Sequence, residues 1–174
     1  MTKKSFFNAV AKGKTDILQI FLNILAKIRS GYCVIGGLAV NAYVEPVVSL
    51  DLDMVIALPD LGKVCGAAAK KGFRIQKYEH SVNLVKAGSD LRIQLQTDAR
   101  YQDFISRSKR KEVLGYRMKV AALEDVLKGK VWAYCDEQRR RSKRQKDLAD
   151  IIRLIEAFPE LKRRIPMKMK QLVK

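Results

Sequence analysis

The stretch Tyr32–Ile56 reads YCVIGGLAVNAYVEPVVSLDLDMVI, and it contains two features that decide how the rest of the chain is interpreted. The first is the pair Gly36 and Gly37, which stands between a strand-like apolar run, Tyr32–Ile35, and a helix-like one, Leu38–Tyr43. Glycines at a strand-to-helix junction let the backbone approach a ligand, and the free N–H groups that open a helix favour an anion such as phosphate. Two glycines in an ordinary turn are the alternative interpretation.

The second feature is the pair Asp51 and Asp53 in a segment, Leu50–Leu58, that otherwise has the composition of a buried strand. Side chains alternate along a strand, so the two carboxylates are expected on the same face. Adjacent carboxylates repel each other unless a cation lies between them, and oxygen ligands on a rigid strand suit Mg²⁺ that carries substrate phosphates. An isolated Asp-x-Asp is also compatible with a solvated strand end.

Composition indicates a folded domain rather than a disordered or membrane chain. The 174 residues are 48% hydrophobic and 30% charged, which is typical of a globular protein with a real core. No apolar run reaches the length of a membrane span, and the N-terminal segment is too weakly apolar for a signal peptide. Cys33, Cys65 and Cys135 are odd in number and lack a metal-binding spacing. We expect a cytoplasmic protein with reduced cysteines and no membrane partner.

Positive charge is the strongest compositional feature. The chain has 35 Lys and Arg against 18 Asp and Glu, for a net charge of +17, and residues 101–174 hold 21 basic and 10 acidic side chains. A field of this sign favours polyanions, and a merely solvated basic face is the alternative. The densest cluster predicts an RNA-binding surface, and its members are Arg139, Arg140, Arg141, Lys143 and Arg144.

The order of expected elements predicts an α+β fold. A helix over Thr15–Ile28 with Thr15 as its N-cap is followed by strands and short helices up to residue 100. Residues 1–100 are therefore interpreted as an α/β core with an N-terminal helix, and residues 101–174 as a basic, mainly helical region. The other expected strands are Arg74–Tyr78, Val82–Val85 and Leu91–Gln96, and the other expected helices are Asp60–Gly72, a short one near Asp103, Leu123–Cys135, Lys146–Phe158 and a last one before the C-terminus.

This combination resembles the polymerase-β-type nucleotidyltransferases, in which a strand, a Gly-Gly or Gly-Ser turn, a helix and an Asp-x-Asp strand follow in order. The chain is most similar to the minimal bacterial enzymes and to the abortive-infection, toxin-type nucleotidyltransferases. Their helical half is similar to LEDVLKGKVWAYCDEQRRRSKRQKDLADIIRL, residues 123–154. The resemblance implies a mixed β-sheet with flanking helices, a helical C-terminal half and NTP as a substrate. It assigns nucleotide binding to Gly36, Gly37, Ser49 and Lys130, Mg²⁺ binding to Asp51 and Asp53, and catalysis to Asp51, Asp53, Lys130 and Asp147.

The sequence departs from the family pattern at two positions. Many relatives carry a third carboxylate on a strand after Asp-x-Asp, where this chain has Gln94, which cannot accept a proton and is a poorer Mg²⁺ ligand. Asp90, Asp98 or Asp147 could complete the site in its place. Val47 stands where some relatives have an arginine, which removes one phosphate contact. Lys130 is also compatible with a solvent-facing position on its helix.

Three functions remain open from the sequence. The first is Mg²⁺-dependent transfer of a nucleoside monophosphate from an NTP to RNA such as tRNA, in a toxin–antitoxin setting. The second is the same chemistry on a protein partner, such as a cognate toxin or antitoxin. The third is a non-catalytic relative that binds nucleotide or RNA, which Gln94 favours.

Overall fold

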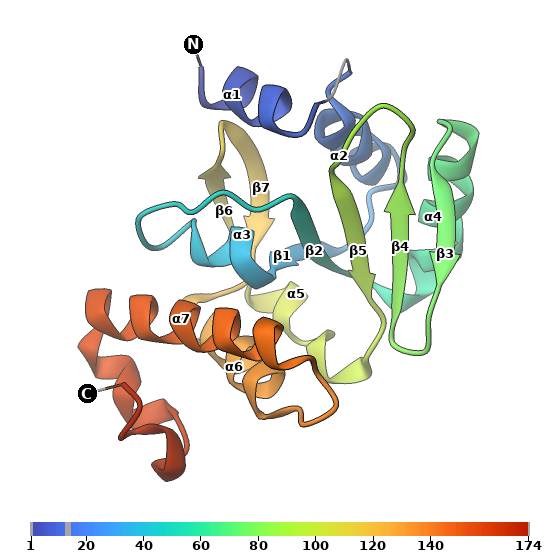
Figure 1. Ribbon diagram of the computed structural model, residues 1–174. Helices are drawn as coiled ribbons and strands as arrows, with labels where there is room; N and C mark the ends of the chain where they lie inside the picture. The colour runs from blue at the N-terminus through green and yellow to red at the C-terminus, as the bar shows by residue number, and fades with distance from the viewer. Residues whose placement is uncertain (1, 13–14, 174) are drawn as a thin grey trace.

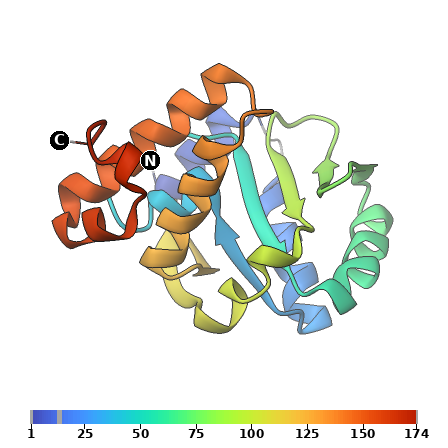
Figure 2. The same cartoon turned by 90° about the horizontal axis from the view of Figure 1, so that it is seen from below.

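The computed structural model describes residues 2–12 and 15–173, and these residues build one mixed sheet with helices on both faces (Figures 1 and 2). The described sheet has seven strands in the order β3-β4-β5-β2-β1-β7-β6. β1 runs parallel to β7 and β2 runs parallel to β5, while the other neighbours are antiparallel. The strands are β1 Tyr32–Ile35, β2 Asp51–Ile56, β3 Arg74–Lys77, β4 Ser81–Val85, β5 Arg92–Gln96, β6 Lys109–Val113 and β7 Tyr116–Val120.

The two faces of the central strands have different neighbours. Leu52 and Met54 on β2 are fully buried in the apolar core, whereas Asp51 and Asp53 alternate with them on the opposite face. α2 and α4 pack together on the core side, and α3, α5, α6 and α7 lie over the face that carries the carboxylates (Figure 2). The helices are α1 Lys3–Val10, α2 Ile17–Ile28, α3 Gly36–Val40, α4 Leu61–Lys70, α5 Phe104–Arg107, α6 Leu123–Cys135 and α7 Arg141–Ala157.

The structure confirms the predicted fold class and corrects several element boundaries. The N-cap of α2 is Asp16, whose side chain accepts a hydrogen bond from the backbone of Gln19, and not Thr15. The helix after β1 begins at Gly36, two residues before the predicted start, and ends at Val40. In place of a last α-helix, the described chain forms two short 3₁₀ helices, Pro159–Arg164 and Met167–Met169. Two further 3₁₀ helices, Leu58–Asp60 and Ala99–Tyr101, precede α4 and α5.

The start of α7 also differs from the prediction. The helix begins at Arg141 rather than at Lys146. Basic residues in a first turn oppose the helix dipole, which is why the sequence favours the later start. In the structure Lys143 and Arg144 are engaged by Asp51 and by the carbonyl of Tyr134, so these tertiary contacts offset the unfavourable charge.

A β-hairpin, β6–β7, lies where the sequence predicts mainly helix. Leu114 and Gly115 form its turn with φ of 54° and 82°, a left-handed pair that suits a tight hairpin. β6 is an edge strand, and its first three residues, Lys109–Lys111, are all basic. The sheet therefore includes strands from both predicted regions, residues 1–100 and residues 101–174. No described helix combines the length and the apolar character that a membrane crossing requires.

Candidate active site

The two glycines lie where β1 passes into α3, directly beside the acidic strand. Gly36 has a φ of +69°, and a Cβ added to it would overlap Oδ2 of Asp53 and lie 2.9 Å from its Cβ and Cγ. A Cβ on Gly37 would instead have Ser49 Oγ as its nearest neighbour, at 3.8 Å. Gly36 is therefore required by its backbone conformation and by its contact with Asp53. α3 has only five residues, so close approach of the backbone matters more here than a helix dipole.

Asp51 and Asp53 share one face of β2, as predicted, but they have different electrostatic surroundings. Asp51 Oδ1 accepts hydrogen bonds from Arg92 Nε and Nη2 at 3.0 and 2.6 Å, and Lys143 Nζ lies 3.4 Å from Oδ2. Burial alone would raise the pKa of Asp51, but Arg92, with Lys143, more than offsets it and holds that pKa below its ordinary value. The pKa of Asp53 is raised, because burial and the charge of Asp51 outweigh the attraction of Lys130.

Gln94 occupies the position that the sequence predicts for it. β2 and β5 pair in parallel with Asp53 opposite Gln94, so the amide stands on the acidic face next to the carboxylate. The two acids considered as replacements are bound elsewhere: Asp90 pairs with Lys12 at 3.0 Å, and Asp98 pairs with Arg100 at 2.6 Å. Neither lines the cleft that contains Asp53, so the third carboxylate is not supplied from these positions.

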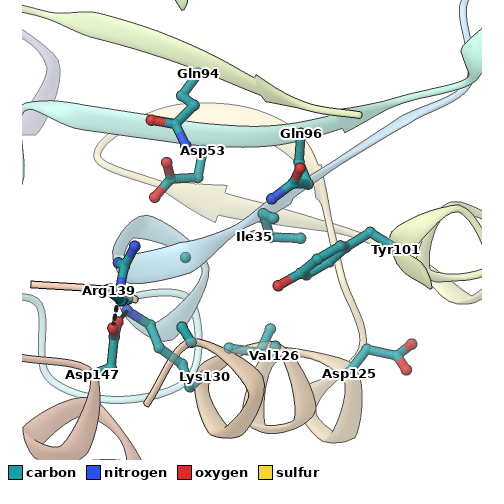
Figure 3. Close-up of a pocket in the computed structure, with 13 residues that line it drawn as sticks. Ile35, Asp53, Gln94, Gln96, Tyr101, Asp125, Val126, Lys130, Arg139 and Asp147 are labelled. Carbon is teal, nitrogen blue, oxygen red and sulfur yellow. Dashed lines mark hydrogen bonds and ion pairs between the residues drawn. The ribbon is translucent and has the colours of Figure 1, made fainter. Parts of the chain in front are cut away.

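A buried ion-pair network connects α6 and α7 at the other wall of the site (Figure 3). Lys130 Nζ lies 2.9 Å from Asp147 and 2.7 Å from Asp150, and its side chain is only 8% exposed. The interpretation of Lys130 as a solvent-facing residue is therefore wrong. Arg139 donates to the other oxygen of Asp147 at 2.7 Å. Burial would lower the pKa of Lys130, but the two carboxylates more than offset it and raise that pKa, so Lys130 stays charged.

Gly36, Asp53, Lys130 and Asp147 all line one cleft between the sheet and the helices, which Figure 3 shows. Tyr101 and Val126 lie across from each other at the end of the cleft away from Asp147 (Figure 3). Burial raises the pKa of Tyr101 to about 12, so its hydroxyl remains protonated. The remaining lining residues are Ile35, Gln94, Gln96, Asp125, Gly129, Ala133 and Arg139.

The loop before the acidic strand is held in place by polar contacts. Ser49 is buried, and its Oγ accepts from the backbone N–H of Asp51 at 3.4 Å. Asn41 brackets the loop by donating to the carbonyl of Val47 and accepting from its N–H. Arg153 on α7 donates to Glu45 O and pairs with Asp150, so the loop and the buried network are joined.

The basic cluster divides into two groups in the structure. Arg139 and Lys143 turn toward the carboxylates of Asp147 and Asp51, and Arg144 donates to the carbonyl of Tyr134. Arg140 and Arg141 are exposed at the start of α7. Together with Arg92, a part of this cluster lines a second pocket that opens beside the acidic pair; its residues are Asp51, Asp53, Arg92, Gln94, Arg139, Arg140 and Lys143.

Arg92 and Asp150 are the residues of the site that sequence reasoning missed. Arg92 stands opposite Asp51 in the register of β2 and β5, and its position two residues before Gln94 already placed it on the same face. Asp150 lies three residues after Asp147 on α7, a spacing that puts both on one side of a helix. The alternation of side chains along a strand and the spacing of residues along a helix could therefore have identified Arg92 and Asp150 from the sequence.

Whether a divalent metal ion can bind depends on the side chains available to coordinate it. Among residues 2–12 and 15–173, no cluster of three or more His, Cys, Asp or Glu side chains is arranged to hold a metal ion. Asp51 and Asp53 offer two carboxylates on one face, and Mg²⁺ is commonly bound by one or two carboxylates together with substrate phosphates and water. The residues present therefore fit an ion that arrives with a polyphosphate better than a site built from protein ligands alone.

Comparison with known structures identifies the fold. The chain aligns with the antibiotic-resistance factor ANT(2″)-Ia in complex with adenylyl-2″-tobramycin at 13% identity over 92% of this chain and 95% of that one, with a TM-score of 0.61. It aligns with the lincomycin-bound lincosamide adenylyltransferase LnuA at 11% identity over 79% and 96% of the two chains, with a TM-score of 0.56. A nucleotidyltransferase-like protein from Paracoccidioides brasiliensis gives 18% identity, 80% and 75% coverage, and a TM-score of 0.53.

No family model matches the sequence. A search of curated proteins also returns no match. The fold is nevertheless that of the polymerase-β-type nucleotidyltransferases, as the resemblance predicts. In this chain Gln94 stands opposite Asp53, and an arginine and a lysine pair with Asp51.

Proposed function

We propose that the protein is a Mg²⁺-dependent nucleotidyltransferase that transfers a nucleoside monophosphate from an NTP to a hydroxyl of RNA such as tRNA. The observation that carries this proposal is the convergence of Gly36, Asp53, Lys130 and Asp147 in one cleft, although they come from four elements of the chain. Within the described residues, Asp53 is a carboxylate without a paired cation beside a glycine with positive φ, an arrangement that core packing does not require. Such strained and poorly compensated positions are typical of functional sites.

The roles of the side chains follow from the charge that nucleotidyl transfer must neutralise. An acceptor hydroxyl attacks the α-phosphorus, its bond to phosphorus forms as the bond to pyrophosphate breaks, and negative charge grows on the leaving group. Asp51 and Asp53 would hold Mg²⁺, which supplies positive charge at the phosphates. Gly36, Gly37 and Ser49 would let the backbone approach the triphosphate, and Lys130 and Arg139 would contribute positive charge from α6 and from the turn before α7. Asp147 keeps Lys130 and Arg139 in position.

The charge around the site supports a polyanionic acceptor. The mouth of the second pocket carries Arg92, Arg139, Arg140 and Lys143, and the whole chain has a net charge of +17. ANT(2″)-Ia has been captured with adenylyl-2″-tobramycin, and tobramycin is a polyamine that these four cations would repel. Phosphates of RNA would instead be attracted, and guanidinium groups bind phosphate through paired donors.

Transfer of radiolabel tests the proposal directly. The protein would be incubated with Mg²⁺, each α-³²P-labelled NTP in turn, and total tRNA. We expect label in tRNA with the wild type and a loss of roughly 10²–10³-fold or more with Asp53→Asn. Asp90→Asn is the matched control, because Asp90 is a carboxylate paired with Lys12 outside the cleft. Chelation of Mg²⁺ should abolish labelling by the wild type and by the control variant.

Gln94 favours one alternative, a non-catalytic relative that binds nucleotide or RNA. The amide faces Asp53 in the position where a carboxylate would take the acceptor's proton. If no label enters tRNA or protein while Mg²⁺ and NTP still bind, this alternative replaces the enzyme. Label in a co-purified protein rather than in tRNA would indicate nucleotidylation of a protein partner. The resemblance to toxin-type enzymes predicts that expression in the bacterial cytoplasm slows growth and that Asp53→Asn removes the effect.

A further inference from the structure

Two cations from different elements hold the carboxylate of Asp51. Arg92, on β5, donates through Nε and Nη2 to Oδ1 at 3.0 and 2.6 Å. Lys143, in the first turn of α7, places Nζ 3.4 Å from Oδ2. Both oxygens of Asp51 thus have a positive side chain beside them, so a divalent ion at either oxygen meets a cation that is already there.

Asp53 is in the opposite situation, although it lies only two residues away. Within the described residues, the carboxylate of Asp53 has no hydrogen-bond or ion-pair partner. Lys130, Arg139 and Lys143 act on it only as more distant charges. A divalent ion that uses both aspartates would therefore find one free carboxylate and one that is already bound.

The positions of Arg92 and Lys143 allow them to move between partners. Arg92 stands opposite Asp51 in the parallel pairing of β2 and β5, and its side chain is 44% exposed. The side chain of Lys143 is 36% exposed. Both line the pocket that also contains Arg139 and Arg140, so a polyphosphate in that pocket lies within reach of either side chain.

Electrostatics makes the two ligands of this site depend on each other. A divalent cation that approaches Asp51 alone is repelled by Arg92 at Oδ1 and by Lys143 near Oδ2, so it binds weakly unless these side chains move away. A polyphosphate alone meets two carboxylates and cations that are already paired. When both arrive together, the metal replaces the cations on Asp51 and the cations gain phosphate oxygens, which a guanidinium binds as well as it binds carboxylate.

We propose that Arg92 and Lys143 exchange between Asp51 and the polyphosphate of the substrate, so that the divalent ion and the polyphosphate bind cooperatively and each binds weakly alone. This inference rests on the proposed function, because it takes Asp51 and Asp53 as the metal ligands. It assigns substrate binding to Arg92, for which the sequence predicted no role, and it moves Lys143 from general RNA contact to the phosphate chain. By linkage, each ligand must strengthen the other by the same factor.

Binding of Mn²⁺ without nucleotide tests the exchange, with free Mn²⁺ measured by electron paramagnetic resonance. We expect weak binding by the wild type and roughly tenfold tighter binding by Arg92→Gln, because the competitor on Asp51 is gone. Arg100→Gln is the matched control: Arg100 binds Asp98 through the same two nitrogens, at 2.8 and 2.6 Å, away from the cleft. Its Mn²⁺ affinity should equal that of the wild type.

Binding of inorganic tripolyphosphate is the second measurement that tests the exchange. Calorimetry without metal should show that Arg92→Gln binds tripolyphosphate more weakly than the wild type, since a phosphate ligand is lost. Lys143→Gln should change both affinities in the same directions and serves as the independent variant if Arg92→Gln does not fold, which circular dichroism would reveal. A variant that binds Mn²⁺ more tightly and tripolyphosphate more weakly than the wild type supports the exchange. A purely structural role of Arg92 would not change the two affinities in opposite directions.

The outcomes separate this inference from the proposed function. If Arg92→Gln and Lys143→Gln bind Mn²⁺ no better than the wild type, while Asp53→Asn binds it less well, the metal site stands and the exchange is overturned. If the wild type and the Arg92 and Lys143 variants bind no more Mn²⁺ than Asp53→Asn does, Asp51 and Asp53 are not metal ligands and the proposed function fails with the inference.

Discussion

Gly36, directly after β1, is in contact with Asp53 on the neighbouring strand β2, and the contact leaves no space for a side chain on the glycine. A Cβ on Gly36 would overlap Oδ2 of Asp53 and lie 2.9 Å from two further atoms of the same side chain. The positive φ of +69° adds backbone strain for any other residue. The glycine therefore fixes where the carboxylate stands, and the two residues form one unit of the site.

Gly36→Ala should abolish nucleotidyl transfer and also lower stability. The left-handed backbone alone costs roughly 1–2 kcal/mol for a residue with a Cβ, and the displacement of Asp53 adds to it. Urea unfolding measures the free energy, and the labelling assay measures the transfer. Gly37→Ala is the matched control for stability, since its Cβ would come no closer than 3.8 Å to Ser49 Oγ. Equal stability losses at both positions would contradict this account.

Asp53→Asn should make the protein more stable while it removes activity. In the described structure the Asp53 carboxylate has no paired cation, and its burial raises its pKa above the unfolded value, so ionisation of this group disfavours folding. The penalty is absent below the unfolded pKa, develops as pH rises through the folded pKa, and is complete above it. We expect the variant to gain roughly 0.5–2 kcal/mol at pH 7 and less near pH 4. Urea unfolding at both pH values measures the difference, and a variant that is less stable than the wild type at pH 7 would refute it.

Lys130→Met should destabilise the protein strongly, because it leaves Asp147 and Asp150 buried with one cation each. Removing one member of a buried ion-pair network typically costs roughly 3–5 kcal/mol. Lys128→Met on the exposed side of the same helix should change stability by less than about 0.5 kcal/mol. Chemical denaturation of both variants measures the contrast. A mild effect at Lys130 would mean that the network relaxes or admits water.

Binding of tRNA should depend steeply on salt, and the exposed arginines before and at the start of α7 should contribute to that dependence. Each lost phosphate contact reduces the slope of log K against log salt by roughly 0.7–0.9. Arg140→Gln with Arg141→Gln should thus lower the slope by about twice that amount. The control removes two cations from the opposite face of the sheet, Lys63→Gln with Lys70→Gln on α4. Filter binding over a salt series gives the slopes, and equal slopes for both double variants would argue against an RNA site at α7.

Much of the fold could be predicted because local pattern and tertiary environment agree. β1 and α6 match their predicted bounds, and Gln94 lies opposite Asp53 on the acidic face as its parity indicates. The hairpin β6–β7 was missed for two reasons. Lys109–Lys111 show no alternation of apolar and polar residues, and Leu114 adopts a positive φ that is unusual for leucine. The early start of α7 depends on contacts with Asp51 and Tyr134, which are distant in sequence.

In the candidate site, too, contacts between residues distant in sequence could not be predicted. Asp51 and Asp53 were predicted from the alternation of a strand and from the resemblance, and Lys130 and Asp147 from the resemblance alone. The structure places Asp53, Lys130 and Asp147 in one cleft, with Asp51 in the pocket beside it. Which cation neutralises which acid could not be predicted, since it depends on the register of β2 with β5 and on the packing of α6 against α7.

The basic edge of the sheet has a consequence for how copies of the chain behave together. An edge strand offers unpaired backbone groups to which a second chain can add, and this is a common route to fibres. Two copies that met through β6 would bring Lys109, Arg110 and Lys111 of both chains into one seam. That mutual repulsion disfavours the addition of a second chain at this edge, so the three basic residues guard the open side of the sheet.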